Sequence, residues 1–182
     1  MTLKIKKEEA VLVLIDYQEK LMPAMENAEE LKESAVKLTL GCDILDVPIV
    51  VTQQYTRGLG PTISEINDAL GEYEPIEKTA FSAMGEPVFV DRLKATGRKT
   101  VILIGIESHV CVQQTAIDLI ESDYSVFVVS DCVSSRKDVD REKALERMAA
   151  SGAIISTVEA VLFELLKDAK NEYFKAISSL VK

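Results

Sequence analysis

The sequence contains the stretch Lys99-Thr-Val-Ile-Leu-Ile-Gly-Ile-Glu-Ser-His-Val-Cys111-Val-Gln-Gln-Thr115, from which the fold can be worked out. The run 101–105 is continuous and apolar apart from its final glycine, which is typical of a parallel strand buried on both faces. After Gly105 the apolar residues take a near-helical spacing, at 112, 116, 117 and 120. A helix therefore follows the strand within a few residues, and we expect Cys111 in its first turn.

This position of Cys111 has chemical consequences. A thiol in the first turn of a helix meets unpaired backbone N–H groups and the positive end of the helix dipole, and both favour the thiolate. The carboxyl edge of the strands in an open α/β sheet is also where ligands bind. We therefore interpret Cys111 as a nucleophile.

Further apolar runs alternate with helical patterns along the rest of the chain. We expect strands at 10–15, 49–52, 76–78, 125–130 and 153–155, and helices at 27–45, 64–70, 87–95, 138–150, 158–166 and 171–180. Asn27 and Thr157 are expected to act as N-caps. This alternation predicts a single α/β domain over residues 1–182, with a six-stranded parallel sheet in a Rossmann-like, three-layer αβα arrangement.

Composition limits the classes of function. A formal net charge of −9 and the lack of a Lys/Arg-rich run argue against nucleic acid as a partner. The N-terminus has no apolar signal core, and no apolar stretch approaches the length needed to span a bilayer, so no membrane is expected. The three cysteines match no metal motif or disulfide framework, which predicts free thiols and a cytoplasmic protein.

A nucleophilic cysteine needs a base or a cation beside it. The chain has one histidine, His109, and a lone histidine is more often a surface or core residue than a catalyst. Asp16 follows the strand 10–15, and Lys78 ends the strand 76–78. Both residues are expected on the same carboxyl edge as Cys111, where a carboxylate can take the thiol proton and an ammonium can stabilise the thiolate.

Three separated motifs resemble those of the isochorismatase-like cysteine hydrolases. They are Ile15-Asp16-Tyr17-Gln18, Glu77-Lys78-Thr79-Ala80-Phe81-Ser82 and Gly105-Ile106-Glu107-Ser108-His109-Val110-Cys111. The resemblance covers nearly the whole chain in the right order. It is closest to the isochorismatase-domain-containing proteins and their bacterial relatives of unassigned substrate.

The resemblance implies a role for each matching residue. Cys111 would form a thioester with the substrate, Asp16 would act as base, and Lys78 would stabilise the thiolate. The peptide bond between Ile106 and Glu107 would be cis, and the backbone N–H groups of Glu107 and Cys111 would form an oxyanion hole. If the family geometry holds, the substrate pocket would be lined by Gln18, Tyr55, Phe81 and Val110.

The sequence departs from the nicotinamidase members of this family. Those members hold a divalent metal with an Asp and two His after the second strand, whereas 52–60 contains neither residue type here. We therefore expect no catalytic metal and no cofactor, and nicotinamide becomes a weaker candidate substrate.

The leading hypothesis is a metal-independent cysteine hydrolase of amidase type, which cleaves the C–N bond of a small amide or a related carbonyl compound. A catalytically silent interaction or scaffold protein, isochorismate-type hydrolysis and a redox-sensing thiol are the alternatives. The resemblance also implies a homo-oligomer, a dimer or larger.

Overall fold

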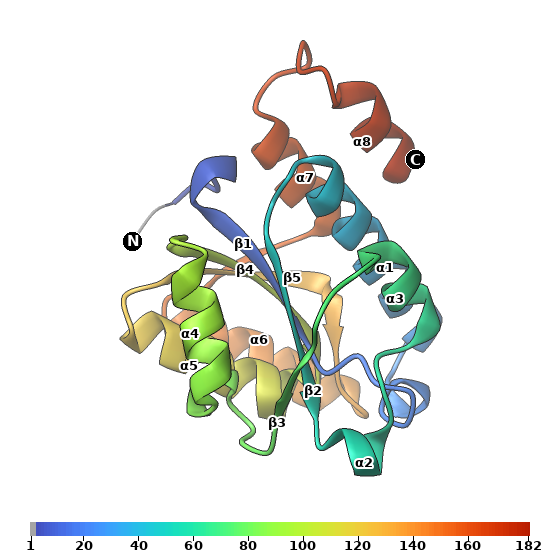
Figure 1. Ribbon diagram of the computed structural model, residues 1–182, viewed down its shortest axis with the longest axis vertical. Coiled ribbons are helices and arrows are strands. Elements are labelled where there is room, and N and C mark those ends of the chain that lie inside the picture. The colour runs from blue at the N-terminus through green and yellow to red at the C-terminus, as the bar shows by residue number, and fades with distance from the viewer. Residues whose placement is uncertain (1–2) are drawn as a thin grey trace.

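The computed structural model describes residues 3–182 (Figure 1). Its centre is a parallel six-stranded sheet with the strand order β3-β2-β1-β4-β5-β6. The strands are β1 (Ala10–Ile15), β2 (Ile49–Gln54), β3 (Ile76–Lys78), β4 (Thr100–Ile106), β5 (Ser125–Ser134) and β6 (Ile154–Ser156). Because the order reverses at β1 and β4, the carboxyl ends of these two strands form the switch point at which such sheets bind ligands.

Helices cover both faces of this sheet, so the predicted three-layer αβα fold is confirmed (Figure 1). The helices are α1 (Ala28–Ile44), α2 (Thr56–Leu59), α3 (Ser64–Leu70), α4 (Pro87–Ala95), α5 (Gln113–Glu121), α6 (Asp138–Ala150), α7 (Val158–Leu166) and α8 (Phe174–Leu180). Within residues 3–182, no helix has both the length and the apolar character needed to cross a membrane.

The alternation of side chains along each strand divides the core in two. Leu12 and Leu14 of β1 pack in the cluster that contains the buried residues of α1, α3, α7 and α8. Val11, Val13 and Ile15 pack in the cluster that contains those of α4, α5 and α6. Every residue of β1 and of β4 is buried, because both neighbouring strands and both helical layers cover them. A continuous apolar run is what this position in the sheet requires.

Several boundaries differ from the sequence-based prediction. β5 continues to Ser134, beyond the predicted end at residue 130, after a break in its register with β4. The single turn α2 lies after β2, where no helix was predicted. Neither Asn27 nor Thr157 makes a side-chain capping bond. The carboxylate of Asp131 accepts the N–H of Val158 instead, at 3.0 and 3.2 Å, so a residue from β5 caps α7.

Gly105 lies where β4 passes closest to β1. Its φ is +140°, and a Cβ built on it would lie 2.3 Å from the carbonyl oxygen of Ile15. We expect Gly105→Ala to lower the free energy of unfolding by about 3 kcal/mol or more, through backbone strain and a clash with main chain. Denaturant titration measures the loss.

The matched control for this substitution is Gly97→Ala. Gly97 also has a positive φ, +67°, but nothing lies within 4 Å of its added Cβ. The control should therefore cost only about 1–2 kcal/mol, the strain of the left-handed conformation alone. Equal losses in the two variants would contradict the close approach of β4 to β1.

Candidate active site

The three residues of the predicted triad meet at the carboxyl edge of the sheet. Asp16 follows β1 directly with a φ of +56°, a left-handed turn that the short polar side chain of Asp tolerates better than most residues. Lys78 is the last residue of β3. Cys111 follows β4 in a π-helical segment, Ser108–Val112, which leads into α5. The topology thus brings together residues that are 33 or more positions apart in the sequence.

Asp16 and Lys78 form a buried ion pair. The Lys78 Nζ atom lies 2.7 Å from Asp16 Oδ2, and both side chains are fully buried. Thr52 donates its hydroxyl to Asp16 Oδ1 at 2.7 Å. Such a pair tolerates the cost of desolvation only when hydrogen bonds satisfy its remaining atoms. Here Lys78 Nζ also donates to Gln54 Oε1 at 2.6 Å and to the carbonyl oxygens of Ala80 and Phe81, each at 3.2 Å.

The surroundings of Cys111 favour the protonated thiol over the thiolate. Burial raises the pKa of Cys111 to about 12; the charge of Asp16 adds to the increase, and the charge of Lys78 opposes it. The expectation that the helix start favours a thiolate is therefore wrong. The ammonium and the carboxylate offset each other, and the cost of a buried charge remains.

The turn that carries Cys111 is anchored on both sides. The peptide bond between Ile106 and Glu107 is cis. The Glu107 carboxylate forms an ion pair with Arg136 at 3.0 Å, and its side chain is 12% exposed. On the other side, Thr115 donates its hydroxyl to the Cys111 carbonyl at 2.7 Å and accepts the N–H of Ala83 at 2.9 Å. These contacts tie the turn to the segment after β5 and to the segment after β3.

The four predicted pocket residues separate into two groups. Gln18 is fully buried, donates to the carbonyl oxygens of Gln54 and Gly60, and accepts the N–H of Gln54. The backbone takes up its whole amide group, and its place in the substrate pocket stays a prediction. Tyr55 and Phe81 are 52% and 56% exposed. The N–H of Tyr55 donates to the Lys78 carbonyl, and the Phe81 carbonyl accepts from Lys78 Nζ. The half-buried Val110 directly precedes Cys111.

The sequence did not single out Thr52, Gln54 and Thr115, although all three contact the triad. Thr52 and Gln54 lie at the end of β2, which places them on the same edge as Asp16. The predicted strand 49–52 ends at Thr52, two residues before Gln54, and this was the available signal. Only the register between β1 and β2 shows which side chain faces the carboxylate. His109 binds Ser135 Oγ through Nδ1 at 2.9 Å.

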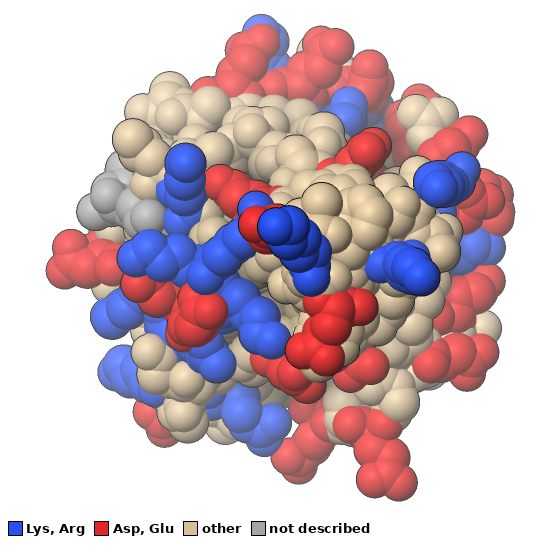
Figure 2. Space-filling model, turned by 90° about the horizontal axis from the view of Figure 1, so that it is seen from above, with Lys and Arg blue, Asp and Glu red and all other residues tan. Residues whose placement is uncertain are grey.

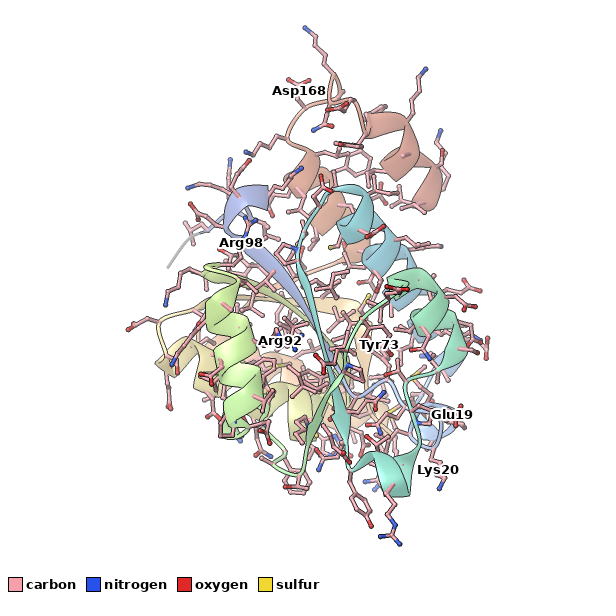
Figure 3. The ribbon with its side chains drawn as sticks, viewed as in Figure 1. Glu19, Lys20, Tyr73, Arg92, Arg98 and Asp168 are labelled. Atoms are coloured by element: carbon pink, nitrogen blue, oxygen red, sulfur yellow. The ribbon has the colours of Figure 1, made fainter. Side chains whose placement is uncertain are left out.

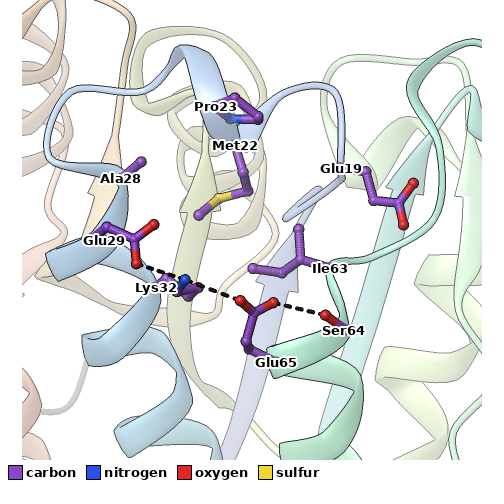
Figure 4. A pocket seen from close by; sticks show the side chains of 9 residues that line it. All are labelled: Glu19, Met22, Pro23, Ala28, Glu29, Lys32, Ile63, Ser64 and Glu65. Carbon is purple, nitrogen blue, oxygen red and sulfur yellow. Dashed lines mark hydrogen bonds and ion pairs between the residues drawn. The ribbon is translucent and has the colours of Figure 1, made fainter.

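Five cavities in the described part of the chain are lined by none of the three triad residues. One of about 290 Å³ is formed by the loop after β1 and by the starts of α1 and α3 (Figure 4). Lys32 spans it, binding Glu29 at 2.7 Å and Glu65 at 3.0 Å (Figure 4). Its charged groups are thus mostly paired with one another. Among residues 3–182, no group of three or more His, Cys, Asp or Glu residues is arranged to hold a metal ion.

A thiol, a carboxylate and an ammonium at the carboxyl edge of a three-layer parallel sheet suit a hydrolase built on an αβα fold. The chain belongs to the isochorismatase family, because the Isochorismatase domain matches residues 10–160. It is 41% identical over 179 residues to isochorismatase domain-containing protein 2 of Danio rerio, a match that covers 98% of this chain and 89% of that protein. The resemblance found in the sequence is confirmed.

Two solved structures share the fold over nearly the whole chain. The structure of MAR1 ribonuclease from Caenorhabditis elegans has a TM-score of 0.92 and 38% identity, and the match covers 98% of this chain and 92% of that one. The YcaC gene product of Escherichia coli, described as an octameric hydrolase of unknown specificity, has a TM-score of 0.93 and 27% identity. That match covers 99% of this chain and 90% of the YcaC chain.

Proposed function

We propose that this protein is a metal-independent cysteine hydrolase that cleaves the C–N bond of a small amide, or a related carbonyl compound, through a thioester. The observation that supports the proposal is the Asp16–Lys78 ion pair, which is fully buried and acts on the Cys111 thiol. Burying two charges costs several kcal/mol per ion unless their partners repay it. An ion pair whose two charges act on a thiol at the ligand-binding edge of the sheet has a chemical use there.

In the first half of the reaction, the carboxylate of Asp16 takes the thiol proton while the sulfur of Cys111 attacks the carbonyl carbon. The carbonyl electron pair moves to oxygen, which the backbone N–H groups of Glu107 and Cys111 stabilise. The intermediate then collapses and the C–N bond breaks. The proton on Asp16 passes to the leaving nitrogen, and an acyl thioester remains on Cys111.

In the second half, Asp16 takes a proton from water as the water oxygen adds to the thioester carbonyl. The C–S bond breaks, the carboxylic acid leaves, and the proton returns from Asp16 to the sulfur. Lys78 keeps its charge throughout and stabilises the sulfur while it is negative. Because burial raises the pKa of Cys111 to about 12, the thiol keeps its proton until the substrate arrives.

Tyr55, Phe81 and Val110 are proposed to line the substrate pocket. Two of them are aromatic side chains exposed by more than half. Tyr55 follows Gln54, the Phe81 carbonyl accepts from Lys78 Nζ, and Val110 precedes Cys111. Partly apolar walls with a few polar groups at the base are typical of small-molecule sites. A small substrate with an apolar portion fits this arrangement.

RNA is a weaker candidate, although one structural relative is described as a ribonuclease. Lysine and arginine side chains gather on one side of the face that contains the amino ends of the strands (Figure 2). Arg98, next to the start of β4, donates to the carbonyl of Lys7 at this end (Figure 3). Because the triad lies at the opposite edge of the sheet, this basic region does not lead to Cys111.

The remaining proposals concern assembly and location. A homo-oligomer is proposed because the YcaC relative is octameric. A cytoplasmic location stays a prediction from the three cysteines, all of which are free thiols. The scaffold, redox-sensor and isochorismate alternatives are outcomes of the experiment below.

The test offers the protein a panel of small amides, esters and isochorismate. Turnover is measured as the amine or acid that is released, with and without a metal chelator. We expect hydrolysis of at least one amide at a rate that the chelator leaves unchanged. As a control, Cys42→Ala should hydrolyse the same substrate at the same rate. Cys42 is a buried free thiol in α1, on the opposite face of the sheet from Cys111. Hydrolysis of isochorismate alone, or no turnover across the panel, would contradict the amidase proposal.

A further inference from the structure

Gln54 is the polar residue most closely joined to the ion pair. Its Oε1 atom accepts from Lys78 Nζ at 2.6 Å, slightly closer than Asp16 Oδ2 at 2.7 Å. Its Nε2 atom donates to the carbonyl of Thr79 at 2.8 Å. With the amide nitrogen bound to Thr79, the side-chain oxygen faces the ammonium.

A second glutamine fixes the backbone of Gln54. The N–H of Gln54 donates to Gln18 Oε1 at 2.6 Å, and Gln18 Nε2 donates to the Gln54 carbonyl at 3.0 Å. Gln18 Nε2 also donates to the carbonyl of Gly60 at 2.6 Å. Gln18 is fully buried, so these bonds are shielded from water. The end of β2 is therefore held in place independently of Lys78.

The ammonium of Lys78 has more acceptors than protons. A lysine has three N–H donors. Asp16, Gln54 and the carbonyl oxygens of Ala80 and Phe81 already make four acceptors around Nζ. Any N–H that stabilises the Cys111 sulfur must be shared with one of them.

We propose that Gln54 is a positioning residue of this site: its side-chain oxygen holds the Lys78 ammonium beside Asp16 and withholds part of it from the Cys111 sulfur. The inference rests on the proposed function. It gives Gln54 a definite role in the reaction, since the thiol stays protonated in the free enzyme and gives its proton to Asp16 only as it attacks. Gln18 supports that role through the backbone of Gln54.

Other charged groups near the site are bound elsewhere. The Glu77 carboxylate accepts the N–H of Thr56, Asp118 accepts from Ser82, and Glu107 pairs with Arg136. The only histidine, His109, binds Ser135. The charges that act on the thiol are those of Asp16 and Lys78. A substitution at Gln54 should therefore reach Cys111 through the ammonium.

The experiment measures the rate of Cys111 alkylation by iodoacetamide against pH, by peptide mass spectrometry, in the full-length protein. Gln54→Met removes the acceptor, frees the ammonium for the sulfur, and should raise the rate at a fixed pH below 10 about threefold to tenfold. Gln54→Glu adds a negative charge beside Lys78 and should lower the rate by a similar factor. If a variant only changed the access of iodoacetamide to Cys111, the alkylation rate would change by the same factor at every pH. A change in the pKa of the thiol instead displaces the rate profile along the pH axis.

The matched control is Gln53→Met, on the adjacent position of β2. Gln53 binds Thr62 at 2.9 Å and Thr56 at 3.1 Å and has no bond to the triad. Its profile should overlay that of the unchanged protein. The proposal is overturned if Gln54→Met leaves the profile in place, if both Gln54 variants displace it in the same direction, or if Gln53→Met displaces it equally. Gln54→Glu, nearly the same size as glutamine, gives the answer if Gln54→Met does not fold.

Lys78→Met separates this inference from the proposed function. Without the ammonium, alkylation of Cys111 should slow. If Lys78→Met slows alkylation and Gln54→Met does not change it, the role of Gln54 is wrong and the triad stands. If Lys78→Met also leaves the profile in place, the ammonium does not act on the thiol, and the proposed function fails with the inference.

Discussion

Cys111→Ala is expected to lower turnover at least about 10⁴-fold while the protein keeps its fold, because the thioester needs the sulfur. The side chain of Cys111 is small and 6% exposed, so its loss leaves only a minor cavity. The measurement is hydrolysis of whichever amide the unchanged protein turns over, with circular dichroism and thermal unfolding as checks on the fold.

Cys132→Ala is the control for this substitution. Cys132 is fully buried, and its pKa lies well above the ordinary value because of burial. It packs in the core cluster on the opposite face of the sheet from Cys111, and it should have little effect on turnover per folded molecule. Turnover that survives in Cys111→Ala would remove the cysteine from the mechanism and leave Asp16 as a base acting directly on water.

Lys78→Met is expected to lower the free energy of unfolding by about 3–5 kcal/mol at neutral pH and to abolish turnover. The substitution leaves the Asp16 carboxylate buried, with Thr52 as its one remaining side-chain hydrogen-bond donor among those that the structure describes. An uncompensated buried charge is what makes breaking such a pair costly. Denaturant titration at pH 7 measures the loss, and the activity assay above measures turnover.

A double variant and a surface pair provide the controls. Asp16→Asn with Lys78→Met removes both charges, and asparagine tolerates the φ of +56°, so much of the stability should return while turnover does not. Arg92→Met breaks the exposed pair between Arg92 and Glu74, which should cost less than about 1 kcal/mol. If the double variant is no more stable than Lys78→Met alone, the loss comes from packing around Lys78 and not from the unpaired carboxylate.

The sequence predicted the sheet well because its strands are buried on both faces. The continuous apolar runs of β1 and β4 need no alternation to be recognised, and the polar residue that follows each strand marks the carboxyl edge. Asp16 and Lys78 could be placed on that edge from strand ends alone. The end of β5 was missed because polar residues, Ser130 and Asp131, interrupt it where its register with β4 changes.

The electrostatics of the site could not be predicted from local pattern. The sequence near Cys111 indicates only the N–H groups at the start of the helix. The pKa of Cys111 depends instead on burial by distant segments and on the opposing charges of Asp16 and Lys78. Gln18 shows the same limit. The family resemblance implied a pocket role for Gln18, but only the return of the chain at Gly60 shows that backbone bonds enclose its amide.

The most direct test of the central claim is detection of the acyl-enzyme by mass. The protein is mixed with an activated small acyl ester or amide, quenched in acid within milliseconds to seconds, and measured intact and after digestion. We expect a mass increase equal to the acyl group on the peptide that carries Cys111, released by hydroxylamine and absent in Cys111→Ala. Turnover with no adduct at any quench time, or an adduct that persists in Cys111→Ala, would contradict the thioester mechanism.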